Sequence, residues 1–213
     1  MNNKITLIVG KKGSGKSLLG SKFIKSMKNK RKYNVIIDTS EKMITEKGLT
    51  YYKLVEINQE NFNKNIDYKK LIKDNKNILF KFRDLLQDEI KETVNKISYA
   101  IYLLGNTLLT VDEAYLFAGK YKPAKNLLRL IYDGRDRAVD QIYITQVIKK
   151  LNSAVINNFD NMISFKQVGD NAISRAKNYL GVKKGVIQNL KKGEYIIRDH
   201  KDNIKKDQLK ELS

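Results

Sequence analysis

The sequence predicts an α/β fold in which helices flank a mostly parallel β-sheet. Short apolar runs rich in β-branched residues alternate along the chain with longer segments of helical periodicity. The apolar runs lack polar alternation, which indicates strands buried on both faces, and intervening helices favour right-handed parallel crossovers. A length of 213 residues fits one domain, and the single proline, Pro123, leaves no proline-rich linker.

The elements follow in order from these patterns. Strands are expected at 5–9, 35–38, 77–82, 107–111, 141–145, 161–165 and 195–198. Helices are expected at 16–29, 85–104, 124–132, 171–179 and 182–190. The polar, Asn-rich segment 41–68 offers one edge strand, at 52–57. We therefore expect one domain over 1–200 with a marginal polar excursion at 41–76, followed by a charged tail at 201–213.

Composition excludes several kinds of chemistry. The chain has no cysteine, which rules out disulfides, thiolate zinc sites, iron–sulfur clusters and cysteine nucleophiles. A histidine-based metal site or Ser-His-Asp triad would depend on one residue, His200. Lys and Arg number 42 against 23 Asp and Glu, a net charge of +19 that favours a polyanionic partner, nucleic acid before an anionic membrane. No apolar run is long enough for a signal peptide or a membrane span, so we expect a cytoplasmic protein.

The first motif that carries chemistry follows the first expected strand and opens the first expected helix. It matches G-x-x-x-x-G-K-[ST] and consists of Gly10, Lys11, Lys12, Gly13, Ser14, Gly15, Lys16 and Ser17. Glycines let backbone amides turn toward phosphates, and the helix directs its positive end at them. Lys16 is expected to contact the β- and γ-phosphates and Ser17 to ligate Mg²⁺. The motif predicts a P-loop NTPase that binds ATP with Mg²⁺, the alternative being a flexible Gly-Ser turn.

The second motif is the apolar strand 107–111 followed by two carboxylates, Asp112 and Glu113. Catalytic groups of α/β folds gather at the carboxyl ends of strands. Asp112 suits the Walker B role of a Mg²⁺ ligand, and Glu113 suits a general base for water that attacks the γ-phosphate. The alternative is an ordinary acidic strand end in solvent.

The third motif is a basic turn, a strand and a terminal amide. Arg135 and Arg137 lie in the turn, and Gln146 follows the strand 141–145. If this strand lies between the other two, Gln146 comes within reach of the γ-phosphate. The alternatives are a Thr-Gln cap after a buried strand and arginines that are simply solvated.

Together these residues resemble the HerA/FtsK-type DNA-translocating ATPases, whose fold is RecA-like (ASCE). The resemblance spans about 4–200 and is greatest to viral genome-packaging ATPases and the ATPase part of the zonula occludens toxin family. It rests on the loop 10–17, the Asp112-Glu113 pair, and an arginine 11 residues before a strand-terminal Thr-Gln. The resemblance implies that Glu113 is the catalytic glutamate, Gln146 a sensor, and Arg135 an arginine finger acting on a neighbouring subunit, with Arg137 as the fallback. Segment 41–105 carries no family motif.

The motifs and the resemblance predict one function and leave three alternatives. The expected activity is ATP hydrolysis to ADP and phosphate coupled to movement of double-stranded DNA by a pentameric or hexameric ring, in viral genome packaging. The ring's expected docking partner is a capsid or membrane vertex protein, with possible association with the virion. Rivals are a filamentous-phage assembly ATPase, a small-molecule kinase and a non-hydrolysing nucleotide-dependent DNA-binding protein. No guanine-reading N/T-K-x-D element, ABC signature or second lobe for a two-lobed helicase occurs.

Two basic runs are candidates to line a DNA channel. One comprises Lys22, Lys25, Lys28, Lys30, Arg31 and Lys32, and the other Lys183, Lys184, Lys191 and Lys192. The alternative for each is a solvated helix face with cations near a helix carboxyl end.

Overall fold

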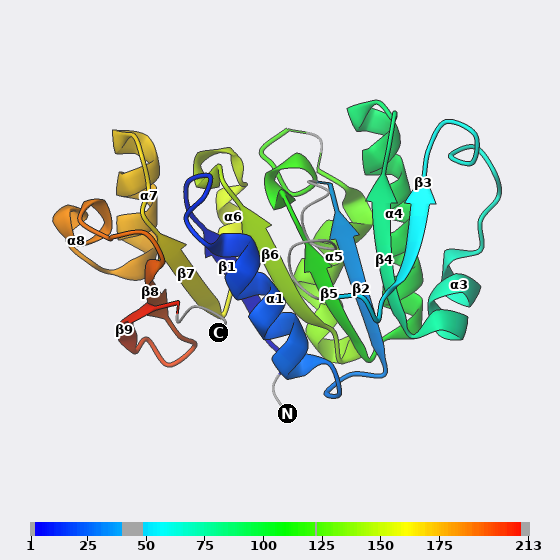
Figure 1. Cartoon of the computed structure of the whole chain (residues 1–213), viewed down its shortest axis with the longest axis horizontal. Helices are drawn as coiled ribbons and strands as arrows, with labels where there is room; N and C mark the ends of the chain where they lie inside the picture. Colours follow the sequence, from blue (N-terminus) through cyan, green and yellow to red (C-terminus); the bar gives the residue numbers. More distant parts are fainter. Residues whose placement is uncertain (1–2, 40–48, 122, 210–213) are drawn as a thin grey trace.

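The computed structural model describes residues 3–39, 49–121 and 123–209. Within these residues a nine-stranded sheet forms the centre, in the order β3-β4-β2-β5-β6-β1-β7-β8-β9 (Figure 1). The strands are β1 (Ile5–Val9), β2 (Tyr33–Asp38), β3 (Lys53–Ile57), β4 (Asn77–Phe82), β5 (Thr107–Val111), β6 (Asp140–Thr145), β7 (Asn161–Phe165), β8 (Glu194–Arg198) and β9 (Ile204–Gln208).

The sheet is parallel from β3 to β7, as the sequence predicts. In the register of its centre, Ile8 of β1 lies beside Ile144 of β6 and Ile163 of β7. Strand β8 pairs antiparallel with β7, and β9 antiparallel with β8. The carboxyl ends of β1 to β7 and of β9 therefore share one edge of the sheet. Strand β6 lies between β5 and β1, which is the order that the Gln146 prediction requires.

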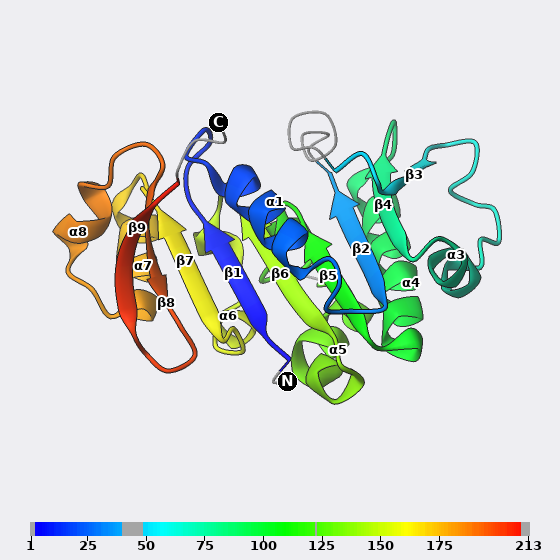
Figure 2. The same cartoon turned by 60° about the horizontal axis from the view of Figure 1, so that its bottom comes forward.

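Helices cover the two faces unequally. They are α1 (Lys16–Met27), α3 (Tyr68–Asn75), α4 (Gln87–Leu104), α5 (Lys125–Asp133), α6 (Ser153–Ile156), α7 (Asp170–Leu180) and α8 (Lys184–Gln188), with short 3₁₀ turns η1 (Ala114–Leu116), η2 (Gly134–Arg137) and η3 (Ile148–Lys150). Figure 2 shows α1 crossing one face while α4 and α5 lie on the other. Ile97 of α4, Leu130 of α5 and Ile173 of α7 belong to the larger apolar core, and Leu19 and Ile24 of α1 to the smaller one.

The structure adds elements that the sequence patterns did not predict. Helix α3 is short, but Ile72 is fully buried and the Asp67 side chain accepts a hydrogen bond from the Lys70 amide at 2.9 Å as an N-cap. Strand β9 lies in the expected charged tail and is exposed along its length, so its backbone pairing with β8 holds it rather than an apolar face. The expected edge strand within 41–68 is confirmed as β3.

Parts of two predicted regions, 40–48 of the polar excursion and 210–213 of the tail, lie outside the described residues. In the described part of the chain, no helix has the length and apolar character needed to cross a bilayer.

Candidate active site

The loop between β1 and α1 has the backbone that phosphate binding requires. Gly15 adopts φ +107°, a left-handed conformation that strains any residue with a side chain. A Cβ on Gly10 would lie 2.6 Å from the Phe165 Cβ and 2.7 Å from the Ser14 Oγ, so only glycine fits there. The Lys11 amide donates to the Lys166 carbonyl oxygen at 3.1 Å and ties the loop to the end of β7. The motif is therefore a defined cradle rather than the flexible turn of the alternative reading.

The polar groups inside this loop fit an anionic ligand. Lys16 is buried at the start of α1, and its Nζ donates to the Lys11 carbonyl oxygen at 2.9 Å, which curls its ammonium over the loop. The Ser14 hydroxyl is buried, and no described residue provides it with a hydrogen-bond partner. The first amides of α1 add the positive end of a helix dipole. A buried hydroxyl without a partner is costly, and a phosphate oxygen would satisfy it.

The two carboxylates lie where β5 ends, at the same edge of the sheet. Asp112 is buried, and its amide donates to the Ile37 carbonyl oxygen at 2.9 Å, which continues the pairing of β5 with β2. Glu113 is half-buried and adopts φ +48°, ψ +46°. A left-handed conformation is unfavourable for a residue with a Cβ, and such residues cluster at functional sites.

Gln146 lies against Glu113. Its side-chain amide donates to Glu113 Oε1, and its backbone amide approaches Glu113 Oε2 at 3.5 Å. The Thr145 hydroxyl accepts from the Val147 amide at 3.2 Å. Thr145 therefore caps the end of the strand, whereas the Gln146 side chain contacts Glu113. The three predicted motifs thus meet at the carboxyl ends of adjacent strands β5, β6 and β1.

The sequence analysis missed a further carboxylate at this edge. Asp38 ends β2, next to β5, and its side chain is fully buried. A signal existed, because the strand expected at 35–38 ends in an aspartate just as the strand at 107–111 runs into Asp112. A single acidic residue after an apolar run carries no motif, so only the strand order relates Asp38 to the site.

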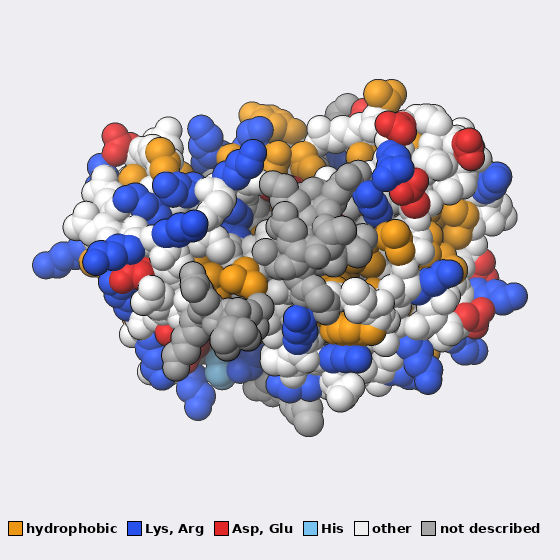
Figure 3. All heavy atoms as spheres, in the orientation of Figure 1, with side chains coloured by type: hydrophobic (Ala, Val, Ile, Leu, Met, Phe, Trp, Pro, Cys, Tyr) orange, Lys and Arg blue, Asp and Glu red, His pale blue; other side chains and the backbone are white. Residues whose placement is uncertain are grey.

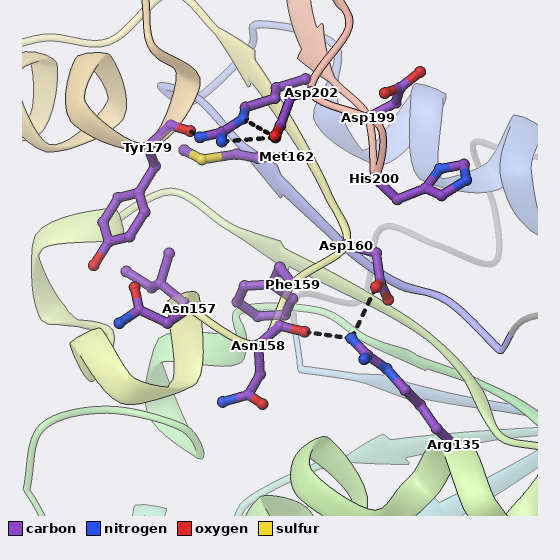
Figure 4. Close-up of a pocket in the computed structure, with 12 residues that line it drawn as sticks. Arg135, Asn157, Asn158, Phe159, Asp160, Met162, Tyr179, Asp199, His200 and Asp202 are labelled. Carbon is purple, nitrogen blue, oxygen red and sulfur yellow. Dashed lines mark hydrogen bonds and ion pairs between the residues drawn. The ribbon is translucent and has the colours of Figure 1, made fainter.

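Arg135 and Arg137 lie at the opposite edge, in η2, where β6 begins. The six residues of β6 separate that edge from Gln146 by about 20 Å. Figure 4 shows Arg135 at a cavity of about 400 Å³, where its Nη2 donates to Asp160 Oδ1 at 2.8 Å and to the Asn158 carbonyl oxygen at 3.1 Å. Neither arginine is brought to the phosphate loop of its own chain.

Arg137 contacts an aromatic ring instead. Its guanidinium carbon lies 4.7 Å from the centre of the Tyr102 ring, and its Nη2 donates to the Tyr102 hydroxyl at 3.5 Å. Arg129 lies over the same ring at 3.7 Å. The hydrogen bond from Arg137 lowers the pKa of the Tyr102 phenol. A structural role on the surface of α4 and α5 accounts for these contacts.

The oxygen donors expected for Mg²⁺ are in place at the phosphate edge. Ser17 lies in the first turn of α1, which follows β1, and Asp112 directly follows β5, which is separated from β1 by β6 alone. Hydroxyl and carboxylate oxygens suit this hard cation, which usually keeps few protein ligands and takes the rest from phosphate and water.

Comparison with known proteins supports the fold. No protein-family model matches the chain, and no curated protein matches it. Among solved structures it is similar to the genome packaging NTPase B204 from Sulfolobus turreted icosahedral virus 2 in complex with AMP, with TM-score 0.74, 22% identity and 100% of both chains covered. It is also similar to B204, the DNA-packaging ATPase from Sulfolobus Turreted Icosahedral Virus, with TM-score 0.68 and 23% identity over 97% of this chain and 98% of that one.

A third similar structure is VirB4 of Thermoanaerobacter pseudethanolicus, with TM-score 0.73 and 11% identity over 99% of this chain and 90% of that one. These similarities show a shared fold. The predicted α/β P-loop NTPase fold is confirmed, and the resemblance to HerA/FtsK-type ATPases is confirmed at the level of the fold.

Proposed function

We propose that this protein hydrolyses ATP to ADP and phosphate and uses the reaction to move double-stranded DNA, as a viral genome-packaging motor does. One observation carries the proposal: the phosphate loop, the Asp112-Glu113 pair and Gln146 converge at the ends of three adjacent strands, with Gln146 bonded to Glu113. An acid-amide pair beside a phosphate cradle suits activation of water better than transfer to a substrate hydroxyl, which argues against a kinase.

Each residue has a distinct task in this mechanism. Loop amides and the Lys16 ammonium bind the phosphates and offset their negative charge. Mg²⁺ held by Ser17 and Asp112 would neutralise charge on the phosphate oxygens. Glu113 accepts a proton from the attacking water, and the Gln146 amide orients that carboxylate while it responds to the γ-phosphate.

Completion of the site requires a neighbouring subunit. The described residues form one nine-stranded sheet and include no second lobe to close over the γ-phosphate. Arg135 is partly exposed at the far edge, where it cannot reach its own nucleotide but can face that of the next subunit in a ring. Arginine fingers of this kind contribute roughly 10³–10⁵ in rate. We propose a pentameric or hexameric ring in which Arg135 acts in trans.

The DNA part of the proposal is supported by charge and by the neighbours' functions. A net charge of +19 favours a polyanionic partner. Two similar structures are of B204, described as a genome packaging NTPase and a DNA-packaging ATPase, and this NTPase has also been solved with AMPPCP and ATP-gammaS. A capsid or vertex protein is the partner that such a motor requires.

The test is phosphate release from ATP with and without double-stranded DNA, alongside light scattering for mass. We expect hydrolysis that DNA stimulates and that Lys16→Ala abolishes, because the phosphates lose their buried counter-charge. Lys73→Ala is the matched control, since Lys73 is an exposed lysine of α3 outside the phosphate loop. Steady binding of ATP without hydrolysis, under all conditions, would favour the nucleotide-dependent DNA-binding protein instead.

A further inference from the structure

A basic cleft lies beside the proposed catalytic pair. It has a volume of about 710 Å³, and we define it by the five residues that give it its character: Lys120, Tyr121, Lys149, Lys150 and Arg175. The three lysines are exposed, and Tyr121 is 90% exposed. Neither basic run singled out in the sequence contains any of these residues.

The cleft is built on the two loops that begin at the catalytic pair. One loop leaves Glu113 through η1, and the other leaves Gln146 through η3. The loops join again further on, because Gly119 forms an antiparallel bridge with Leu151 and the Lys120 amide donates to the Lys150 carbonyl oxygen at 3.1 Å. Glu113 and Gln146 are bonded at one end of this unit, and the basic side chains lie at the other.

Among the described residues, no carboxylate forms an ion pair with the basic side chains of the cleft. Arg175 donates to the carbonyl oxygens of Lys149 at 3.0 Å and Leu151 at 2.8 Å and to the Ser153 Oγ at 3.0 Å, all of them neutral groups. Arg175 therefore stabilises the loop that carries Lys149 and Lys150, and no carboxylate neutralises its charge in these contacts. Lys150 lies over the Tyr115 ring at 5.0 Å. The described residues that line the cleft include no acidic side chain.

The two sequence-predicted runs differ in this respect. Arg31 of the first run is bound to Asp140 at 2.7 Å, with only 9% of its side chain exposed, and Lys184 of the second is bound to Asp170 at 2.6 Å. Figure 3 shows Lys and Arg side chains scattered over the face that carries α1, so lysine content alone does not mark a binding surface. The basic cleft instead combines concavity, several cations and no counter-charge.

We propose that the basic cleft binds the phosphate backbone of double-stranded DNA. Lysines, arginines and tyrosine hydroxyls are the side chains that contact DNA phosphates, and such contacts carry no sequence information. The inference rests on the proposed function and gives it a location: DNA contacts the loops that begin at Glu113 and Gln146. The two loops are joined by hydrogen bonds at the catalytic pair and again at the cleft. A conformational change at Glu113 and Gln146 would therefore be transmitted to the bound DNA.

The test is fluorescence anisotropy of the full chain with a labelled DNA duplex of arbitrary sequence, at several salt concentrations. The cleft variant is Lys149→Gln with Lys150→Gln. The control is Lys25→Gln with Lys30→Gln, which removes the same charge from exposed positions of the first run. We expect the cleft variant to lose affinity on the order of tenfold and its salt slope to fall by roughly two, since each phosphate contact contributes about 0.9. The control should remain within about twofold of the unmodified chain.

Three outcomes would overturn the inference. Equal losses in both variants would mean that diffuse charge binds DNA, and a loss in the control alone would move the contact to α1. A preference for duplex RNA over duplex DNA would reject the ligand. In each case the proposed motor could stand, whereas a chain that hydrolyses ATP yet binds no duplex would reject the proposed function as well. Lys120→Gln, on the other loop, repeats the test with one charge removed, and thermal melting verifies that every variant is folded.

Discussion

The polar groups at the two ends of the parallel strands differ in whether they are paired within the chain. At the edge where the parallel strands end, Glu113 adopts a left-handed backbone conformation. Within the part of the chain that the structure describes, the buried Ser14 hydroxyl at this edge has no partner, and the basic cleft is lined by no acidic side chain. At the edge where they begin, Arg31 is paired with Asp140 and Arg135 with Asp160. We call the first the open edge, because its polar groups are available to the proposed ligands. We call the second the closed edge, because its charged side chains are paired within the chain.

The closed edge is built around the start of β1. Asp140 Oδ1 accepts from the Lys4 amide at 2.9 Å, and Asp160 Oδ2 accepts from the Ile5 amide at 2.7 Å. Each carboxylate therefore accepts from both a guanidinium and a backbone amide, that of Lys4 just before β1 or that of Ile5 at its first residue. The comparison indicates that open polar groups on one edge are tolerated because the opposite edge anchors the strand that carries the phosphate loop.

Removing Arg135 should have the largest effect, because it tests whether the closed edge also serves a neighbour. We expect Arg135→Ala to reduce kcat for ATP by about 10³–10⁵. Mixing it with Lys16→Ala should restore part of the activity, since each variant supplies what the other lacks. Arg137→Ala is the matched control and should cost far less, because Arg137 stacks on Tyr102. Full activity from a protein that stays monomeric by light scattering would remove the trans role.

Glu113→Gln tests the open edge directly. The amide keeps the size and hydrogen-bonding capacity of the side chain but cannot accept a proton, so we expect ATP binding to persist while turnover falls by about 10²–10⁴. Equilibrium binding and phosphate release measure the two quantities separately. Asp74→Asn, which removes an exposed carboxylate on α3, should change neither. Unchanged turnover in Glu113→Gln would reopen the kinase reading.

Arg31→Met tests how far the closed edge supports the fold. The substitution leaves the buried Asp140 carboxylate without its counter-charge, so we expect the free energy of unfolding to fall by about 3–5 kcal/mol in urea denaturation. Adding Asp140→Asn should recover part of that loss, because an amide oxygen still accepts from Lys4 and no unpaired charge remains. A loss below about 1 kcal/mol would mean that water reaches the pair.

Ser14→Ala should have the smallest effect and the opposite sign. It removes a buried hydroxyl that has no partner, so we expect the free energy of unfolding to rise by about 1 kcal/mol without nucleotide. The gain should shrink when ATP is present, because the hydroxyl then has a phosphate oxygen to contact. A loss of stability without nucleotide would show that the Ser14 hydroxyl forms a hydrogen bond in the free protein.

The sequence predicted most of the sheet because its central strands are buried on both faces. Strands β1, β4, β5 and β7 begin and end at the predicted residues. The exposed strand β9 escaped prediction because it is held by backbone pairing with β8, and pairing between strands leaves no periodic apolar signal. Helix α3 escaped prediction because few of its residues are apolar, although Tyr68 and Ile72 are buried in the core.

The candidate site likewise has a part that the sequence predicted and a part that only the fold shows. The loop 10–17 could be read from the sequence because its chemistry is local: the glycines, Lys16 and Ser17 are neighbours in the chain. Asp38 could not, since its relation to Asp112 depends on β2 lying beside β5. The placement of Arg135 at the far edge was implicit in its position before β6, but its pairing with Asp160, 25 residues away, was not.

The sequence by itself predicts the phosphate-binding loop proposed for this protein, because the loop glycines, Lys16 and the Asp112-Glu113 pair form short, contiguous patterns. Only the tertiary structure decided which charges remain available to a partner. Whether a cation is neutralised depends on carboxylates distant in sequence, as Arg31 and Asp140 are, 109 residues apart. The same folding that paired Arg31 left Lys149 and Lys150 beside Arg175, whose charged guanidinium donates only to neutral oxygens, and no count of lysines along the chain predicts this.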